Sequence, residues 1–280
     1  MNTRNGKMGL DYGKLVLDGF ETIELEQKNF IDYPGNEVVE WYGFRRHNFE
    51  LEGCKGFIVE PINPAPGLPW CWCTQWAEAF VPRTPALKLL ERGFHHVHLD
   101  VFSTRMNPEG IKKVEAFYAM LRSLKFHPKA ALIGMSYGGL FSLRWAQEHP
   151  ETVGVIYLDA PVTDLGFANR SGDKGITKDS LVNAAAYGVA PEELSSHPLS
   201  PNNNFQAIAD AKIPILCLRS GQDLTVLPQE NTDVFASRLT AAGGKIRVVN
   251  RSLNGHHPHG LDDPAPLAEF ILRYYPELEF

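Results

Sequence analysis

Cysteine is scarce in this chain of 280 residues, which contains only Cys54, Cys71, Cys73 and Cys217. Four cysteines are too few for the disulfide framework of a chain this long. Cys71 and Cys73 are separated by a single residue, which is not the usual spacing of zinc ligands. We therefore expect buried free thiols, and we expect neither a metal nor a cofactor.

Clustered positive charge is also missing. The formal net charge is −6, the isoelectric point is near 5.9, and basic and acidic residues are interspersed. Because nucleic-acid binding depends on clustered Lys and Arg side chains, we expect no nucleic-acid partner.

Long apolar runs are absent as well. No window approaches the ~20 apolar residues of a membrane span, and residues 1–10 lack the apolar core of a secretory signal. The sequence predicts a soluble protein without a membrane span, either cytoplasmic or exported by a signal that it does not contain. The oligomeric state is left open.

A hydrophobic fraction of 44% is enough for a substantial core. No stretch rich in Gly, Ser or Pro divides the chain, which predicts one catalytic domain over residues 45–280. Residues 1–44 are expected to form an N-terminal extension that packs on this domain without sharing its repeating pattern.

Strand-like and helix-like segments alternate along the domain. Strands are expected at 45–52, 56–60, 70–73, 94–100, 130–133, 153–158, 214–218 and 246–249, and helices at 85–92, 114–124, 140–148 and 267–274. This alternation predicts an α/β fold in which a mainly parallel central sheet carries helices on both faces.

Residues 161–212 interrupt the alternation. A structureless loop of that length is uncommon inside a compact domain, so short helices are expected there, one of them near 178–187. Lying between two core strands, the segment is predicted to form a short helical cap over the end of the sheet. The alternative is an insertion remote from any site.

Ser136 lies in the sequence Gly-Met-Ser-Tyr-Gly-Gly, between the apolar run 130–133 and the helix-like stretch 140–148. This is the strand, sharp turn and helix context in which G-x-S-x-G forms a nucleophile elbow. The alternative is that Ser136 only caps the helix that follows it.

A serine nucleophile needs a base, and that base needs an orienting acid. Asp223 follows the strand 214–218 and His256 follows the strand 246–249, in the order Ser, Asp, His. This order predicts a triad in which Ser136 is the nucleophile, His256 is the base and then the acid, and Asp223 orients the imidazole.

Three motifs together resemble the α/β-hydrolase superfamily over roughly residues 45–275. They are the Ser136 turn, the spacing of Gly221, Asp223 and Pro228, and Gly255-His256 followed by Asp262-Asp263-Pro264. The resemblance implies an α/β-hydrolase fold, and it selects His256 because the catalytic histidine of the family directly follows a glycine.

Other titratable residues stay open as alternatives. His257 or His259 could serve as the base if the loop turns differently, and Asp159 occupies a position that some members of the superfamily use for the triad acid. A structural role is favoured for the remaining candidates, which are Asp164, His95, His96 and His98.

An oxyanion hole requires about two N–H donors. The backbone amide of Tyr137 is expected to be one of them. By the resemblance, the second comes from a His-Gly loop, but this chain departs from that pattern in Trp72-Cys73-Thr74-Gln75-Trp76. We expect Trp72 or Cys73 to supply the donor, and the departure argues against close kinship with lipases that have a glycine-rich oxyanion loop.

The tryptophan-rich segment could also bind substrate, because aromatic faces pack against sugar C–H surfaces. Trp76 and Glu78 are the expected substrate-binding residues. Core packing is favoured for at least two of Trp70, Trp72 and Trp76.

These observations predict a serine-dependent carboxylic ester hydrolase that works through an acyl-enzyme. The motifs also resemble those of bacterial carboxylesterases associated with carbohydrate breakdown, which implies a small-molecule or carbohydrate ester as substrate. The alternatives are a peptidase or amidase, another hydrolase that uses a triad, and a non-catalytic binding module. A dehalogenase is disfavoured, since Ser136 stands where an aspartate would be required.

Overall fold

Strand β4 (Trp70–Gln75) shows how the sequence specifies the centre of the sheet. All six of its residues are buried. Trp70 and Trp72 belong to one apolar cluster and Cys71 and Cys73 to another, because successive side chains of a strand point to opposite faces. The core role favoured for two of the tryptophans is thereby confirmed, and a strand buried on both sides requires a helical layer on each.

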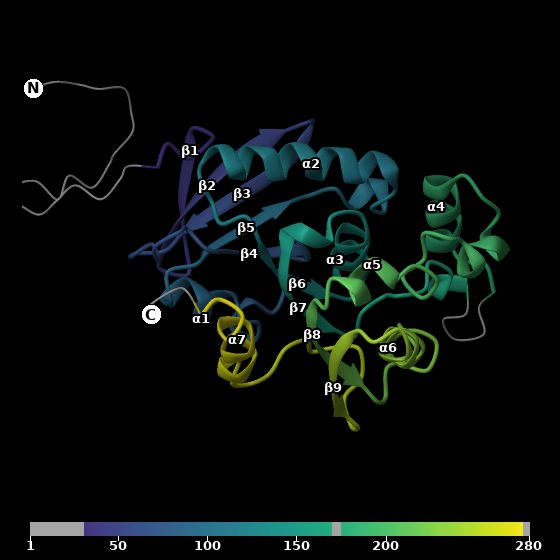
Figure 1. Ribbon diagram of the computed structural model, residues 1–280. Coiled ribbons are helices and arrows are strands. Elements are labelled where there is room, and N and C mark those ends of the chain that lie inside the picture. Colours follow the sequence, from purple (N-terminus) through teal and green to yellow (C-terminus); the bar gives the residue numbers. More distant parts are fainter. Residues whose placement is uncertain (1–30, 170–174, 277–280) are drawn as a thin grey trace, which may run out of the picture.

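The computed structural model describes residues 31–169 and 175–276, and within these ranges the chain forms a nine-stranded sheet (Figure 1). The strand order is β1-β2-β3-β5-β4-β6-β7-β8-β9. The strands are β1 (Glu37–Trp41), β2 (Phe44–Leu51), β3 (Cys54–Glu60), β4, β5 (His95–Leu99), β6 (Ala130–Met135), β7 (Val153–Asp159), β8 (Pro214–Ser220) and β9 (Lys245–Arg251). From β5 to β9 every neighbouring pair is parallel, whereas β1, β2 and β3 are joined to each other and to β5 by antiparallel pairs.

Helices cover both faces of this sheet. They are α1 (Ala86–Glu91), α2 (Pro108–Ser123), α3 (Tyr137–Glu148), α4 (Lys178–Tyr187), α5 (Gln206–Asp210), α6 (Thr232–Ala241) and α7 (Ala265–Leu272). Side chains of α1 and α7 belong to one core cluster, and those of α2, α3, α5 and α6 belong to the other. The mainly parallel sheet and its two helical layers confirm the predicted fold class (Figure 1).

Helix α3 lies deepest in the molecule. Every residue from Tyr137 to Gln147 is buried, so this helix has no solvent-facing stripe. The helix contacts β4, β6 and β7 of the sheet, and α5 and Pro161 lie against it elsewhere. Helix α3 therefore anchors the turn that precedes it.

The termini of the helices follow the expected chemistry. Asn107 caps α2, because its side-chain oxygen accepts a hydrogen bond from the Gly110 amide at 3.0 Å. Gly93, the expected stop of α1, has a φ of 84°, a conformation that glycine adopts without steric cost. Local sequence thus defines where both helices begin or end.

Part of the expected N-terminal extension belongs to the sheet. Strand β1 pairs with β2 in an antiparallel register, from Glu37 opposite Asn48 to Trp41 opposite Phe44. It forms one edge of the nine-stranded sheet. The first 30 residues of the extension lie outside the described residues.

The predicted helix at residues 178–187 is confirmed as α4. It begins at a capping box formed by Thr177 and Ser180, and it ends at Gly188 with a φ of 68°. The segment after β7 also contacts the Ser136 turn directly, because the Val162 amide donates to the Ser136 carbonyl at 2.9 Å. The insertion therefore lies against the site that the sequence predicts.

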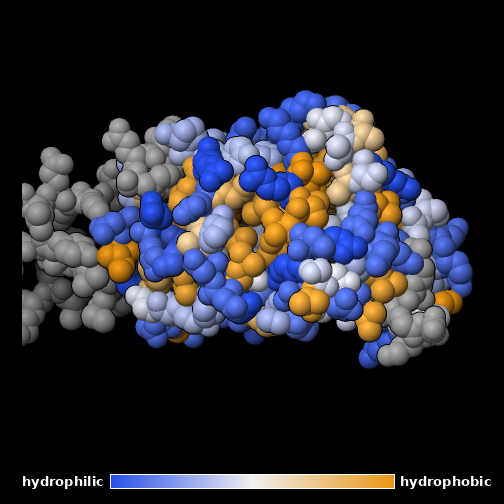
Figure 2. All heavy atoms as spheres, turned by 90° about the horizontal axis from the view of Figure 1, so that it is seen from below, coloured by the Kyte–Doolittle hydropathy of each residue, from blue (hydrophilic) through white to orange (hydrophobic). Residues whose placement is uncertain are grey.

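The surface mixes polar and apolar side chains. On the face turned toward α7 and β9, apolar side chains form a band across the middle that is flanked by polar ones (Figure 2). None of the helices in the described ranges has both the length and the apolarity to cross a bilayer.

Candidate active site

The turn between β6 and α3 places Ser136 in a strained conformation. Its φ is 52° and its ψ is −119°, a combination that non-glycine residues adopt only where the surrounding structure enforces it. The neighbouring glycines make this possible: a Cβ on Gly139 would lie 2.3 Å from the Cβ of Pro161, and one on Gly134 would lie 2.7 Å from the Gly138 carbonyl oxygen. The Ser136 side chain makes no capping hydrogen bond to α3, so the alternative role as a helix cap is wrong.

The Ser136 hydroxyl instead lies within hydrogen-bond distance of a histidine. The Nε2 atom of His256 lies 3.0 Å from Ser136 Oγ, and its Nδ1 atom lies 2.6 Å from Asp223 Oδ2. The three side chains come from the loops that follow β6, β8 and β9, whose carboxyl ends meet at one edge of the parallel sheet. This is the hydrogen-bonded order in which a base activates a hydroxyl and an acid orients the base.

The loop after β8 holds Asp223 firmly. The carboxylate is buried, and its Oδ1 atom accepts hydrogen bonds from the amides of Thr225 and Val226 at 2.8 and 2.9 Å. These two bonds leave Oδ2 directed at His256. Because the carboxylate cannot rotate without losing them, the orientation of the imidazole is fixed before any ligand binds.

The structure separates the three histidines of the loop after β9. His259 is buried, and its Nδ1 atom lies 3.1 Å from Asp159 Oδ1. His257 is exposed and stacks on Phe80 with 5.4 Å between ring centroids. Partial burial lowers the pKa of His257, and the neighbouring His256 and His259 lower it further. Only His256 lies between the Ser136 hydroxyl and a carboxylate.

Asp159, the alternative triad acid, anchors the loop instead. Its buried carboxylate accepts hydrogen bonds from Tyr157 Oη at 2.9 Å, from Arg251 Nη2 at 2.6 Å and from the Gly260 amide at 2.6 Å. Together with His259, these partners tie the end of β9 and the histidine loop to the end of β7. Asp159 therefore positions the loop that carries His256. The carboxylate of Asp164 accepts a hydrogen bond from the amide of its sequence neighbour Gly166 at 2.8 Å.

The amide of Tyr137 is the first of α3, and amides in the first turn of a helix have no partner within the helix. It directly follows Ser136, where an oxyanion would form. The Tyr137 side chain points away into the core and donates to Asn183 Oδ1 at 3.2 Å. Burial raises the pKa of this phenol to about 12, so the side chain stays neutral.

The expectation for the second oxyanion donor needs correction. Trp72 pairs with both β5 and β6, and Cys73 pairs with β6, so both backbones lie inside the sheet. Burial also raises the pKa of the Cys73 thiol to about 12, and all four cysteines are free and buried, as expected. The chain leaves the strand only after Gln75, and Trp76 turns it with a φ of 64°. Neither Trp72 nor Cys73 is therefore placed to bind an oxyanion.

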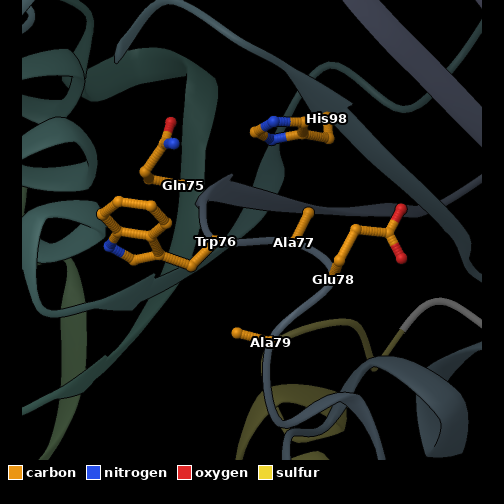
Figure 3. Close-up of a pocket in the computed structure, with 6 residues that line it drawn as sticks. All are labelled: Gln75, Trp76, Ala77, Glu78, Ala79 and His98. Carbon is orange, nitrogen blue, oxygen red and sulfur yellow. The ribbon is translucent and has the colours of Figure 1, made fainter.

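The segment after β4 lines a pocket of about 360 Å³ (Figure 3). Its lining residues are Gln75, Trp76, Ala77, Glu78, Ala79 and His98. Trp76 is 39% exposed, and its ring packs at 5.0 Å on Phe102, which in turn packs at 5.3 Å on Tyr137. Trp76 thus connects the pocket to the residue that follows Ser136.

Glu78 points the other way. Its side chain leaves the segment on the side opposite to Trp76 (Figure 3). Its carboxylate forms an ion pair with Arg46 and accepts a hydrogen bond from Trp41 Nε1 at 3.0 Å. The structure therefore assigns Glu78 to the contact with β1 and β2, and it does not bring Glu78 together with the triad.

Sequence reasoning missed several residues that support the site. Arg105 is buried beneath Tyr137 and Phe102, with its guanidinium 3.8 Å from the Phe102 ring centroid. Asn231 Oδ1 accepts from the amides of Thr163 and Asp164 at 2.9 and 3.0 Å, which joins the insertion to the loop after Asp223. The only sequence signal for a role of Asn231 was that a polar residue precedes a helix. The sequence around Arg105 contained no signal for its role.

Within the part of the chain that the structure describes, the residues that could hold a metal ion are His256, His257 and His259. Their potential ligand atoms lie within 4.8 Å of one another. The sequence predicts that the protein binds no metal, and this expectation stays a prediction.

Comparison with solved structures reveals similar folds at low sequence identity. Est1E from Butyrivibrio proteoclasticus is 15% identical, with a TM-score of 0.58, over 82% of this chain and 99% of that chain. The acylaminoacyl peptidase of Pyrococcus horikoshii is 13% identical, with a TM-score of 0.58, over 83% of this chain and 41% of that chain. A putative dipeptidyl aminopeptidase IV from Bacteroides ovatus is 17% identical, with a TM-score of 0.58, over 84% of this chain but 36% of its own. The chain thus spans less than half the length of the two peptidases.

The sequence matches no curated protein. A model of the prolyl oligopeptidase family, however, matches residues 111–275, which include Ser136, Asp223 and His256 and make up more than half of the 280 residues. From this match and the fold, the chain belongs to the prolyl oligopeptidase family and has an α/β-hydrolase fold.

Proposed function

We propose that the chain is a carboxylic ester hydrolase that works through an acyl-enzyme on Ser136. The observation that carries the proposal is the continuous hydrogen-bonded line from Ser136 Oγ through His256 to Asp223, with distances of 3.0 and 2.6 Å. A hydroxyl on a strained turn, in contact with an imidazole that a buried carboxylate orients, has the activation that nucleophilic catalysis requires.

In the first half-reaction, Ser136 Oγ attacks the ester carbonyl carbon while His256 Nε2 takes the hydroxyl proton. The Tyr137 amide binds the negative oxygen of the tetrahedral intermediate. A second donor would come from the first amides beyond β4, those of Trp76 and Ala77. When the intermediate collapses, the C–O bond to the alcohol breaks, and His256 gives its proton to the leaving oxygen.

In the second half-reaction, His256 takes a proton from water as the water oxygen attacks the acyl-enzyme carbonyl. Collapse of this intermediate breaks the bond to Ser136 Oγ, which recovers its proton from His256. The acid product leaves and the enzyme returns to its starting state. Asp223 remains ionised throughout and stabilises the imidazolium that forms in each half.

We further propose that the ester is a small acyl group on a carbohydrate. The support is Trp76, which is 39% exposed at the rim of the 360 Å³ pocket. An exposed indole offers a flat apolar face to sugar C–H groups. Replacing Trp76 with alanine should raise the KM for an acetylated sugar and leave hydrolysis of p-nitrophenyl acetate nearly unchanged.

Hydrolysis of p-nitrophenyl acetate tests the chemistry. Ser136→Ala should abolish it, whereas Ser123→Ala should not, because Ser123 is an exposed serine at the end of α2. A fluorophosphonate probe, followed by peptide mapping, should label Ser136 alone. Full activity of Ser136→Ala, or labelling of another serine, would refute the assignment.

An amidase or peptidase is the second candidate, favoured by the match to the prolyl oligopeptidase family. The same triad can cleave amides, since fold and triad do not define the substrate. Parallel assays with acetylated sugars and with aminoacyl p-nitroanilides separate the two. A kcat/KM that is higher for the anilides would replace the esterase proposal with this one.

A further inference from the structure

The loop after β9 gathers three imidazoles in a small volume. The ring centroids of His256, His257 and His259 are separated by 4.8, 4.9 and 5.1 Å. One ligand atom of each ring lies within 4.8 Å of those of the other two. The proposed hydrolysis uses only His256, and His259 anchors the loop through Asp159, but neither role accounts for the exposed His257 beside them.

In two of the rings, a carboxylate holds the Nδ1 atom. Asp223 holds His256 by its Nδ1 atom at 2.6 Å, and Asp159 holds His259 by its Nδ1 atom at 3.1 Å. A carboxylate on one ring nitrogen is the usual support of a metal-binding histidine, because it fixes the ring and makes the other nitrogen a better ligand. The Nε2 atom is thus the remaining ligand atom of both His256 and His259, and in His256 it now contacts Ser136 Oγ at 3.0 Å.

The third ring is adjustable. His257 is exposed, and beyond the other two imidazoles its ring stacks on Phe80. Zinc–nitrogen bonds of about 2.0–2.1 Å in a tetrahedral site require ligand atoms about 3.3 Å apart. Because the present separations are at most 4.8 Å, the nitrogens must approach one another by no more than about 1.5 Å, and rotation of the exposed His257 side chain can shorten its distances to the other two.

The charge around the cluster favours a cation. The carboxylates of Asp159 and Asp223 lie directly behind two of the imidazoles. Arg251 neutralises only one of them, through its contact with Asp159 at 2.6 Å. The nearby Arg83 forms an ion pair with Asp262, and its Nε atom donates to the His259 carbonyl. One carboxylate thus remains to offset the charge of a bound ion.

We propose that His256, His257 and His259 form an inhibitory binding site for a divalent metal ion that prefers imidazole ligands, with Zn²⁺ as its representative. The ion occupies His256 Nε2, the same atom that receives the proton of Ser136. Metal binding and proton transfer are therefore mutually exclusive. The inhibition rests on the proposed function of His256, whereas the binding itself does not.

Zinc titration of the full chain, freed of metals with a chelator, tests the proposal. Zn²⁺ should inhibit hydrolysis of p-nitrophenyl acetate, EDTA should restore it, and Mg²⁺, which prefers oxygen ligands, should have no effect. Inhibition by Mg²⁺ equal to that by Zn²⁺ would overturn the site.

His257→Gln removes one ligand without touching the triad. It should keep the basal rate and raise the half-inhibiting zinc concentration by roughly tenfold or more, since even changes to supporting residues weaken metal sites that much. His197→Gln, in the insertion, is the matched control and should keep the zinc sensitivity of the unchanged chain. Equal zinc sensitivity of His257→Gln and the unchanged chain would overturn the site.

Calorimetry separates this proposal from the proposed function. Zn²⁺ should bind Ser136→Ala at a stoichiometry of one and with an affinity at least equal to that of the unchanged chain, because His256 Nε2 has lost its serine partner. If the chain hydrolyses no ester yet binds Zn²⁺ through His257, the proposed function fails and the site stands. Inhibition without calorimetric binding to Ser136→Ala would place the ion elsewhere and overturn the site.

Discussion

Two neighbouring histidines of β5 should make the protein sensitive to acid. His95 and His96 are 0% and 1% exposed, and neither has a carboxylate partner in the described part of the chain. Burial, which disfavours the charged imidazole, lowers the pKa of each from 6.5 to about 3. Both histidines are therefore neutral in the folded protein at pH 5, where they would be charged in the unfolded chain.

The sign of the effect follows from proton linkage. Between pH 6.5 and about 3 the unfolded chain binds more protons at these sites than the folded protein, so the free energy of unfolding falls as the pH falls. From pH 7 to pH 5, each histidine should remove about 2 kcal/mol of stability, and the pair about 4 kcal/mol. Carboxylates that titrate near pH 4 contribute little in this window.

His96→Phe isolates half of this effect. His96 packs against the rings of Trp41 and Phe57, its Nδ1 atom lies 3.4 Å from Cys71 Sγ, and its Nε2 atom has no hydrogen-bond partner among the described residues. A phenyl ring fits such surroundings and cannot take up a proton. Urea unfolding followed by tryptophan fluorescence at pH 5, 6 and 7 should give a pH dependence that is smaller in the variant by about 2 kcal/mol. Identical pH dependences would refute the assignment of acid sensitivity to buried neutral histidines.

Three further changes should act through contacts at the site. Asp223→Asn should lower kcat by about 10³–10⁴-fold, because the amide no longer stabilises charged His256. Circular dichroism should show an intact fold, and a loss of kcat below tenfold would contradict the proposed role. Gly139→Ala should lower the free energy of unfolding in urea by about 1–3 kcal/mol, since its Cβ would lie 2.3 Å from that of Pro161. Unchanged stability would show that the backbone near Pro161 moves aside without cost. Asp159→Asn should lower the free energy of unfolding by about 3–5 kcal/mol, because its partner Arg251 keeps its charge without a carboxylate beside it. A loss below about 1 kcal/mol would show that the ion pair contributes little to stability.

The fold could be predicted from the sequence because its strands and helices differ in apolar periodicity. The run Trp70 to Cys73 is apolar at every position, as a strand buried on both faces must be. Strand β1 escaped this reasoning, since four of its five residues are exposed and only pairing with β2 defines it. Helix α6 was not anticipated either, because few of its residues are buried.

The triad could be predicted because each member follows a strand in a fixed order, but the second oxyanion donor could not. Thr74 and Gln75 are polar, and the expected strand therefore ended at Cys73. In the structure the strand continues to Gln75, since the buried Thr74 hydroxyl donates to the Gly138 carbonyl at 2.7 Å. That contact joins residues 64 positions apart, and no local pattern contains it.

The burial of α3 along its length has a consequence for cooperativity. A helix without a solvent-facing side cannot detach from the sheet while the rest of the molecule stays folded, so its amides should exchange with deuterium only through global unfolding. The elbow that carries Ser136 is continuous with this helix and shares its protection. Catalytic activity should therefore disappear together with the last protected amides, and the active fraction of a partly denatured sample directly measures its folded fraction.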